Sequence, residues 1–446
     1  MTSFTDKFLD KIRSAKSFKS LYKIPLKLFK NKKPSLTVSK PVKILLLTST
    51  CNGFGDVIFS HKLKKYLQDW YGSLVEVKIA TNSVKQFVSI KEDINDLIHL
   101  SVTAADNQCN PFNMMKPYNA SKFINENLLV SEEIESFDLY FIAPITYDFT
   151  PNYNEIRRLV KNSNQFNTFF LCEYNYPIHK DVLFNVGIGN GRLGIFLVGS
   201  DIKYPKLKVF SHPYSIIYIA KNDDHISNCY LGFLELLTAK YNLPRLEIVC
   251  PDWMREQIER DSSSIINSVD EHYSRIMYVY KDGEEVITEN ITSYSEVGNQ
   301  LVFRLDILPV PFTDMLSIYQ HSIPHVLLTG DQSITDFLSL RHKTSMPFYQ
   351  GLPWKQNFYT KLAKALPNKF FRSYKTSCGN LDAIKYDPSF TRFIKNNDFR
   401  IKAKPLMDAV ICSAGYDSEE YNDIKNTIVH SRKLSTLKRK ILKLSS

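Results

Sequence analysis

The segment VKILLLTSTCNGFGD, which runs from Val42 to Asp56, decides the fold of this chain. Its first seven residues form a short apolar run, which is typical of a buried parallel strand. A glycine-containing loop follows, and then a helical pattern of apolar residues from Val57 to Trp70, before residues 75–80 predict the next strand. A strand, a loop, a helix and a second strand in this order predict a parallel α/β sheet, with the loop at the carboxyl edge of the strands.

The same pattern begins again halfway along the chain. Residues 214–220 predict a strand, 221–227 a polar loop, 229–240 a helix and 246–250 another strand. Shorter apolar runs predict strands in both halves, at residues 98–100, 139–144, 168–172, 195–198, 275–280, 302–307 and 325–329. Helices are predicted at 313–321 and 334–340. The fold class is therefore α/β, with two doubly wound Rossmann-like domains that we expect to face one another across a cleft.

The 446 residues divide into four predicted parts. Residues 44–205 form the N-terminal Rossmann-like domain and 206–385 the C-terminal one, with a hinge rich in Lys and Pro at 203–213. Residues 1–43 are a basic segment, and 386–446 are a helical extension with a basic tail. Both domains are long enough to bury a core of their own.

The positive charge of the chain is concentrated at its two ends. The net charge is +11, of which residues 1–43 hold +10 and residues 426–446 hold +6, so the body between them carries −5. A nucleic-acid enzyme would carry its basic groove through the fold itself, and we therefore expect no nucleic-acid partner. The apolar residues among the lysines between Phe4 and Phe29 have a partly helical spacing. Both basic ends could lie on an anionic membrane surface, or they could be solvated tails.

Composition and motifs exclude several other classes. No apolar run is long enough to span a membrane, and the N-terminus has no signal-peptide pattern, which argues against a periplasmic binding protein. Seven scattered cysteines without a C-x-x-C pair predict a reducing, cytoplasmic location without structural zinc. No H-E-x-x-H or G-x-S-x-G motif occurs, so neither metal nor serine catalysis is expected.

Two loops are the candidate binding sites, because each follows a strand at the predicted carboxyl edge. The first contains Asn52, Gly53, Phe54, Gly55 and Asp56. Its glycines allow a sharp turn and a close approach to a ligand. Asp56 could act as a general base or could merely cap the helix that it opens.

The second loop opens the helix predicted at 334–340. It contains Thr329, Gly330, Asp331, Gln332 and Ser333. Free backbone N–H groups and the helix dipole make such a turn a candidate diphosphate site, to which the Ser333 hydroxyl could add a hydrogen bond. An ordinary capping turn would have the same residue types. We favour a binding role because both loops should face the same cleft.

A glycine-rich motif at residues 187–194 formally contains G-x-G-x-x-G. The dinucleotide-binding motif needs a helix directly after its glycines, to receive the pyrophosphate. Here the apolar run 195–198 predicts a strand instead. The motif is therefore interpreted as a tight turn, and an NAD-dependent oxidoreductase is the weakest of the functional alternatives.

The residues from Leu308 to Tyr319 resemble the C-terminal region of GT-B glycosyltransferases, in which a proline, a short helix, a strand, a small polar loop and a helix surround the sugar nucleotide. Residues 346–355 resemble a further donor-side loop of that fold. At the level of loops, the chain is similar to bacterial protein-arginine rhamnosyltransferases. Their N-F-G-D-type loop is matched by residues 53–56, and their acidic-Ser donor loop by residues 331–333.

The resemblance implies a role for each matching residue. Asp56 would be the catalytic carboxylate, and Gln332 and Ser333 would contact the donor diphosphate. The family has a second acidic residue where this chain has Gln332, and that departure puts an identical mechanism in doubt. Since no D-x-D triplet occurs, the resemblance implies no metal, and cations would neutralise the diphosphate. The remaining donor-side candidates are Tyr349, Gln350, Lys355 and Arg192.

The sequence thus predicts a metal-independent glycosyltransferase without a cofactor. The N-terminal half would bind an acceptor, which could be a glycan, a lipid or a protein, and the C-terminal half a nucleotide-diphosphate sugar. A non-catalytic binding protein with the same fold is the main alternative, and the loss of an acid at Gln332 favours it.

Overall fold

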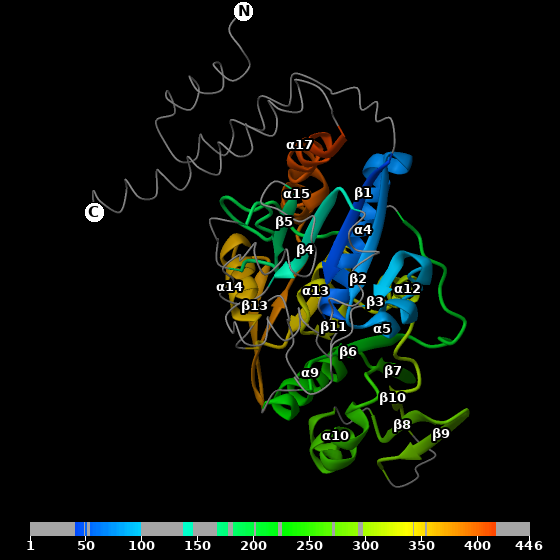
Figure 1. The fold of residues 1–446 in the computed structure, drawn as a ribbon. Coiled ribbons are helices and arrows are strands. Elements are labelled where there is room, and N and C mark those ends of the chain that lie inside the picture. The colour runs from blue at the N-terminus through cyan, green and yellow to red at the C-terminus, as the bar shows by residue number, and fades with distance from the viewer. Residues whose placement is uncertain are drawn as a thin grey trace, which may run out of the picture. The chain divides into compact units, whose positions relative to one another are not determined.

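The computed structural model describes residues 41–48, 50, 54–99, 137–145, 167–176, 182–199, 202–221, 225–269, 273–292, 298–341, 343–352 and 355–415 (Figure 1). The chain forms two compact units. Unit 1 comprises residues 1–196 and 397–446, and unit 2 comprises 197–396. Unit 2 is therefore inserted between two parts of unit 1, and each unit is described by itself.

Unit 1 contains a parallel sheet of five strands in the order β3-β2-β1-β4-β5. The strands are β1 (Val42–Thr48), β2 (Val75–Thr81), β3 (Leu97–His99), β4 (Leu139–Ile145) and β5 (Thr168–Cys172). Helix α4 (Gly55–Tyr71) packs against β1, β2 and β4, and α5 (Val84–Ser89) packs near β3. The strand order reverses between β1 and β4, so the loop after β1 opens at the switch point where ligands bind in such sheets.

Unit 2 contains a sheet of nine strands in the order β13-β14-β12-β11-β6-β7-β10-β8-β9. Its six central strands are parallel: β6 (Tyr214–Tyr218), β7 (Arg245–Val249), β8 (Arg275–Asp282), β10 (Gln300–Arg304), β11 (His325–Leu328) and β12 (Met346–Tyr349). At the two edges β9 (Glu285–Asn290), β13 (Phe371–Thr376) and β14 (Gly379–Ile384) pair in antiparallel fashion. The switch point lies between β6 and β11.

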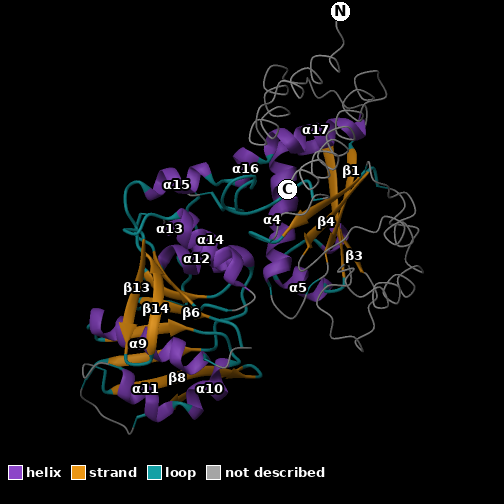
Figure 2. Ribbon diagram, turned by 90° about the vertical axis from the view of Figure 1, so that its left-hand side faces the viewer, coloured by secondary structure: helices purple, strands orange, loops and turns teal. Residues whose placement is uncertain are grey.

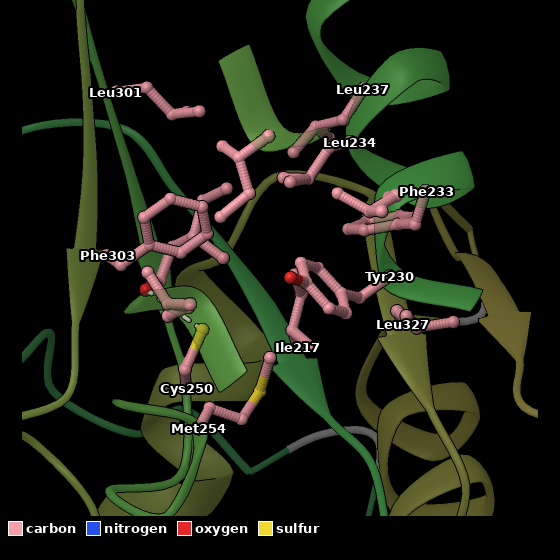
Figure 3. Packing of buried hydrophobic residues seen from close by; sticks show 14 of the residues in the cluster. Ile217, Tyr230, Phe233, Leu234, Leu237, Cys250, Met254, Leu301, Phe303 and Leu327 are labelled. Atoms are coloured by element: carbon pink, nitrogen blue, oxygen red, sulfur yellow. Dashed lines mark hydrogen bonds between the residues drawn. The ribbon is translucent and has the colours of Figure 1, made fainter. Parts of the chain in front are cut away.

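Helices cover both faces of the unit 2 sheet (Figure 2). One face carries α9 (Ile226–Lys240), α10 (Met254–Arg260) and α11 (Ser262–Ser268), and the other carries α12 (Phe312–His321), α13 (Asp331–Arg341) and α14 (Gln356–Ala365). The buried side of α9 presents Tyr230, Phe233, Leu234 and Leu237 to the strands (Figure 3). All four side chains are 0% exposed, and burying each contributes roughly 1.5–3 kcal/mol to the free energy of unfolding.

The structure confirms the α/β class and two doubly wound sheets. The predicted strands at 42–48, 75–80, 139–144 and 168–172 correspond to β1, β2, β4 and β5. Two local predictions were wrong. Residues 195–198 make only an isolated bridge at Ile195, and the predicted turn at 330–333 is already helical from Asp331.

The boundaries of the units also differ from the predicted domains. The first boundary lies at residues 196 and 197 rather than at 205 and 206. The predicted extension 386–446 is divided: α15 (Phe390–Asn396) belongs to unit 2, whereas α16 (Phe399–Lys402) and α17 (Lys404–Gly415) belong to unit 1. A backbone hydrogen bond of 2.7 Å from Ile195 N to Asn397 O joins the two parts of unit 1 at this crossing.

Candidate functional site

Gln350 organises the carboxyl edge of unit 2 at the switch point. It follows β12, is 1% exposed, and its side-chain oxygen accepts a 2.9 Å hydrogen bond from Ala220 N, just after β6. The same oxygen accepts from the Thr329 hydroxyl, just after β11. One side chain thus fixes the loops after three neighbouring strands. The structure therefore brings together Thr329 and Gln350, two of the residues expected at the donor site.

Asp331 and Lys355 form an ion pair beside these loops. Asp331 is the first residue of α13 and is 5% exposed, and Lys355 Nζ lies 3.5 Å from its Oδ2. The carboxylate occupies the positive end of the helix dipole. A diphosphate placed directly at this helix end would be repelled by that carboxylate. The Lys355 ammonium group, in contrast, could attract a phosphate oxygen.

Gln332 and Ser333 are directed into the protein. Gln332 is 8% exposed, and Ser333 lies beside the phenol of Tyr319, whose pKa burial raises well above its usual value. Gly330 precedes them, and its Cα carries no side chain that could cover the helix end. The role of Gln332 and Ser333 as diphosphate contacts stays a prediction, and these contacts favour a structural role for both.

The N-terminus of α9 offers a better place for an anion. This helix of 15 residues follows β6, has no acidic residue in its first turn and has no side-chain cap. Its first backbone N–H groups and its dipole therefore favour negative charge. Among the described residues the loop that precedes it ends at His225.

A cavity of about 300 Å³ lies beside this helix end. Its wall includes His225, Asn228 and Cys229 from α9 and its cap, together with Tyr349 and Gln350. The remaining lining residues are Gly351, Tyr359, Cys378, Gly379, Asn380, Leu381 and Asp382. Burial raises the pKa of the Asp382 carboxyl group. Tyr349 and Tyr359 stack with their ring centroids 4.7 Å apart, which makes one wall of the cavity flat and aromatic.

A second cavity, of about 430 Å³, lies on the other side of the same helix end. It is lined by Lys221, Ile226, Ser227, Trp253, Glu256, Gln257 and Arg260. Two cavities thus adjoin the start of α9: one has aromatic and amide side chains in its wall, and the other has two cations and the carboxylate of Glu256. An extended ligand with an anionic centre would suit this arrangement.

Sequence reasoning missed His225, Asn228 and the other α9 residues. The sequence did contain an indication of them, because the polar loop 221–227 follows the first predicted strand of the second half. The carboxyl end of that strand is where doubly wound folds bind ligands.

In unit 1, the loop after β1 is held by side chains that follow β2. Thr50 N donates a 2.9 Å hydrogen bond to Asn82 Oδ1, and Asn82 Nδ2 donates back to Thr50 O at 3.2 Å. The Thr50 hydroxyl also donates to Gln86 Oε1 at 3.1 Å. Of the predicted acceptor loop, Asn52 and Gly53 lie outside the described residues.

Asp56 is the second residue of α4 and is half-buried. The N-cap position is occupied by Phe54, and no side chain makes the cap hydrogen bond. Asp56 is therefore not the N-cap residue itself but an acidic residue of the first helical turn. The choice between stabilising the helix end and acting as a general base stays a prediction. Its carboxyl group lies in the first helical turn, and carboxylates are among the side chains that act as general bases.

Arg192 belongs to unit 1, whereas the other donor-side candidates belong to unit 2. Its guanidinium is buried, donates to the carbonyl of Tyr176 and reaches Val186 O at 3.5 Å. These contacts tie together the glycine-rich turn, so we leave Arg192 out of the donor site. The turn closes on itself through hydrogen bonds between Gly187 and Gly194, and residues 195–199 contain no helix that could receive a pyrophosphate.

Several predictions fall outside the described residues, among them the basic segment before residue 41 and the tail 426–446. Within the part of the chain that is described, no helix is both long and apolar enough to cross a membrane. No cluster of three or more His, Cys, Asp or Glu able to hold a metal occurs in those same ranges.

Comparisons with known proteins found likeness only among solved structures. No protein-family model and no curated protein sequence matches the chain. E. coli heptosyltransferase WaaC with ADP-2-deoxy-2-fluoro heptose is 11% identical, with 71% of this chain and 91% of that chain covered and a TM-score of 0.35. A glycosyl transferase family 9 protein from Veillonella parvula is 8% identical, with 68% and 80% covered and a TM-score of 0.33.

A third solved structure is an alpha-glucosyltransferase in complex with UDP and a 13-mer DNA containing an HMU base. It is 12% identical, with 86% of this chain and 100% of that chain covered and a TM-score of 0.37. These structural neighbours are all glycosyltransferases. At identities and TM-scores this low, the activity of the present chain has to be argued from its own residues.

Proposed function

We propose that this protein is a metal-independent GT-B-type glycosyltransferase that moves a sugar from a nucleotide-diphosphate donor to an acceptor. Unit 2 binds the donor and unit 1 binds the acceptor. The observation that carries the proposal is the start of α9, which opens at the switch point of a parallel sheet between two cavities.

Each part of the donor has a counterpart at this site. The diphosphate lies at the N-terminus of α9, where backbone N–H groups and the helix dipole stabilise its charge. The nucleoside lies in the cavity beside the stacked rings of Tyr349 and Tyr359, with Asn228 and Asn380 within its wall as hydrogen-bonding amides. Gln350 and Thr329 hold the loops around it, and Lys355 adds a cation next to Asp331.

The transfer breaks the bond between the sugar C1 and the diphosphate oxygen and forms a bond between C1 and the acceptor nucleophile. The electron pair of the broken bond stays on the leaving nucleoside diphosphate, so negative charge grows on the phosphate as the reaction proceeds. Preorganised dipoles directed at that charge lower the barrier without a metal. Asp56 either takes the proton from the acceptor nucleophile or orients that nucleophile towards C1.

Nucleoside diphosphate binding is the first test. We expect one of UDP, GDP, dTDP, CDP or ADP to raise the melting temperature of the full chain, since ligand at 100 times its Kd adds about 2.7 kcal/mol of stability. The variant Asn228→Asp places a negative charge in the first turn of α9 and should abolish that shift. The helix itself should tolerate the change, because an acid in the first turn is favourable by about 0.3–1 kcal/mol.

Ser263→Asp is the matched control. Ser263 is exposed in the first turn of α11 and does not line either cavity, so the same change of charge should leave the ligand shift intact. If no nucleoside diphosphate stabilises the chain, or if Asn228→Asp binds as tightly as the natural protein, the proposed donor site is wrong.

A second candidate function is a non-catalytic binding module with the same fold. The burial of Gln332 and the proximity of Ser333 to Tyr319 favour it, because both are consistent with structural roles for these two residues. Slow hydrolysis of the donor sugar, measured with the nucleotide that gives the thermal shift, separates the two. Binding without hydrolysis or transfer would support the module.

A further inference from the structure

The two edges of the unit 2 sheet carry opposite charge. Residues 355–396, which include α14, the β13–β14 hairpin and α15, contain nine Lys or Arg and two Asp, a net +7. Residues 252–269 and 273–292, which include α10, α11 and the β8–β9 hairpin, contain four Lys or Arg and eight Asp or Glu, a net −4. We call these the basic edge and the acidic edge.

The sheet order keeps these two edges apart. β13 is the first and β9 the last of nine strands (Figure 1). With about 4.8 Å between neighbouring strands, β13 and β9 lie roughly 38 Å apart along the sheet. This separation exceeds the Debye length of about 8 Å at physiological salt, so the acidic residues of the β8–β9 hairpin do not neutralise the cations of β13.

The cations of the basic edge face solvent. The exposed ones are Lys361, Lys364, Lys369, Arg372, Lys375, Lys385, Arg392 and Lys395. Lys369 pairs with Asp387 at 3.3 Å, and Asp382 faces the cavity described above. The positive charge is therefore available on the outer strand β13, on the helices α14 and α15, and in the loops between these elements.

We propose that the basic edge of unit 2 docks on an anionic lipid surface. Juxtaposed lysines and arginines each contribute about 1 kcal/mol near such a surface. The acidic edge is repelled from the same surface, so the charge separation also fixes which end of unit 2 faces the lipid.

The shape of the basic region favours a lipid surface over a nucleic acid. Its cations lie along an outer strand and on helix surfaces, which suits a broad anionic plane. Nucleic-acid sites combine cations with a groove. The cavity beside the basic edge contains no Lys or Arg among its lining residues.

Binding of the full chain to vesicles tests the proposal. We compare phosphatidylcholine vesicles with and without phosphatidylglycerol by co-sedimentation, and expect binding only to the anionic ones, with loss at about 0.5 M NaCl. A variant with Lys361→Gln, Lys364→Gln, Arg372→Gln and Lys375→Gln should bind the anionic vesicles at least tenfold more weakly.

The matched control changes four exposed cations of unit 2 that lie outside the basic edge, by Lys203→Gln, Lys206→Gln, Lys208→Gln and Lys240→Gln. It loses the same charge and should lose less than twofold in binding. Because both variants keep the basic terminal segments, their comparison isolates the basic edge from those segments.

Two outcomes would overturn the proposal. One is equal loss in both variants, which would mean that only total charge matters. The other is unchanged vesicle binding with lost binding to a short DNA or RNA duplex, which would identify a nucleic-acid surface. Neither variant alters a residue of the donor site, so the nucleoside diphosphate shift should persist in both, and it reports separately on the proposed function.

Discussion

At the scale of single residues, Asp56 carries the sharpest prediction. Its place in the first turn of α4, at the switch point of unit 1, suits a general base for the acceptor. Asp56→Asn keeps the shape of the side chain but cannot accept a proton, so sugar transfer should fall by about 10²–10⁴-fold. Transfer is measured with the donor nucleotide identified by thermal shift.

The donor site provides the control for that variant. Because Asp56 lies in unit 1, the nucleoside diphosphate shift should be the same in Asp56→Asn and in the natural protein. The free energy of unfolding should change by about 1 kcal/mol or less, through the helix dipole. Transfer at the natural rate in a folded Asp56→Asn variant would remove Asp56 from the mechanism.

His325 provides a prediction about pH. The residue is 7% exposed, and Tyr241 Oη lies 2.7 Å from its Nδ1. Burial, and secondarily the charge of Lys240, lower the pKa of His325 from 6.5 to about 4. The unfolded chain therefore binds a proton more readily than the folded one. The stability that this neutral histidine contributes is present above pH 6.5 and is lost as the pH falls towards 4.

Urea unfolding near pH 7 and near pH 4.5 measures this effect. His325→Gln keeps a polar side chain that does not titrate. On acidification the natural protein should lose about 2 to 3 kcal/mol more unfolding free energy than this variant. The variant will be less stable near pH 7, because a cavity and an imperfect hydrogen bond replace the ring. Equal losses in the two proteins would show that His325 titrates normally in the folded state.

At the scale of elements, the glycine-rich turn at 187–194 joins two distant parts of the chain. Gly194 has φ of 91°, and a Cβ there would lie 2.4 Å from Asn397 O and 2.8 Å from Phe399 N. Both contacts are backbone atoms of the segment that leads into α16. Gly194→Ala should therefore destabilise unit 1 through backbone strain and through displacement of that segment.

A comparison of Gly194→Ala with Gly189→Ala isolates the second of these causes, the displacement of the segment. Gly189 has φ of 118°, but no atom lies within 4 Å of the position of its Cβ. The two variants share the cost of an unfavourable backbone conformation, of order 1–3 kcal/mol. Gly194→Ala should lose about 2 kcal/mol more than Gly189→Ala in chemical unfolding, as overpacking typically costs. Similar losses would mean that the 397–399 segment moves away without cost.

The elements that the sequence predicted well are those with a clear hydrophobic pattern. β1 and β6 are continuous apolar runs, because both faces of a parallel strand are buried. The strand β12 was missed, because Pro347 lies within its four residues and such a residue normally indicates a loop. The β13–β14 hairpin was missed because its burial is irregular and its exposed residues are mostly polar.

The candidate site was predicted only in part, and for a reason of topology. Thr329 was found because it lies at the end of a predicted strand, whereas Gln350 and Lys355 came from the resemblance of residues 346–355 to a donor-side loop. The burial of Gln332 could not be predicted, because it depends on how α13 packs in three dimensions. The cavity beside α9 is lined in part by the β13–β14 hairpin, whose pairing was not visible in the sequence pattern.

At the scale of the whole molecule, the chain has two units, and each has its own sheet. Units with separate cores can open independently, and a ligand that binds one of them stabilises that one first. We therefore expect the nucleoside diphosphate to slow amide hydrogen exchange in peptides from residues 197–396. Peptides from β1, β2 and α4 should change little. Trp253 in unit 2 and Trp70 in unit 1 provide fluorescence probes of the same difference.

The proposed donor site predicts which elements of unit 2 the nucleotide protects from exchange. The largest protection should lie in α9 and in the loops after β6, β11 and β12, because these elements surround the proposed diphosphate and nucleoside. Asn228→Asp should remove the protection, and Ser263→Asp should keep it. Equal protection of both units in the natural protein would show that they unfold as one body. Protection confined to unit 1 would place the nucleotide there and would reverse the proposed roles of the two units.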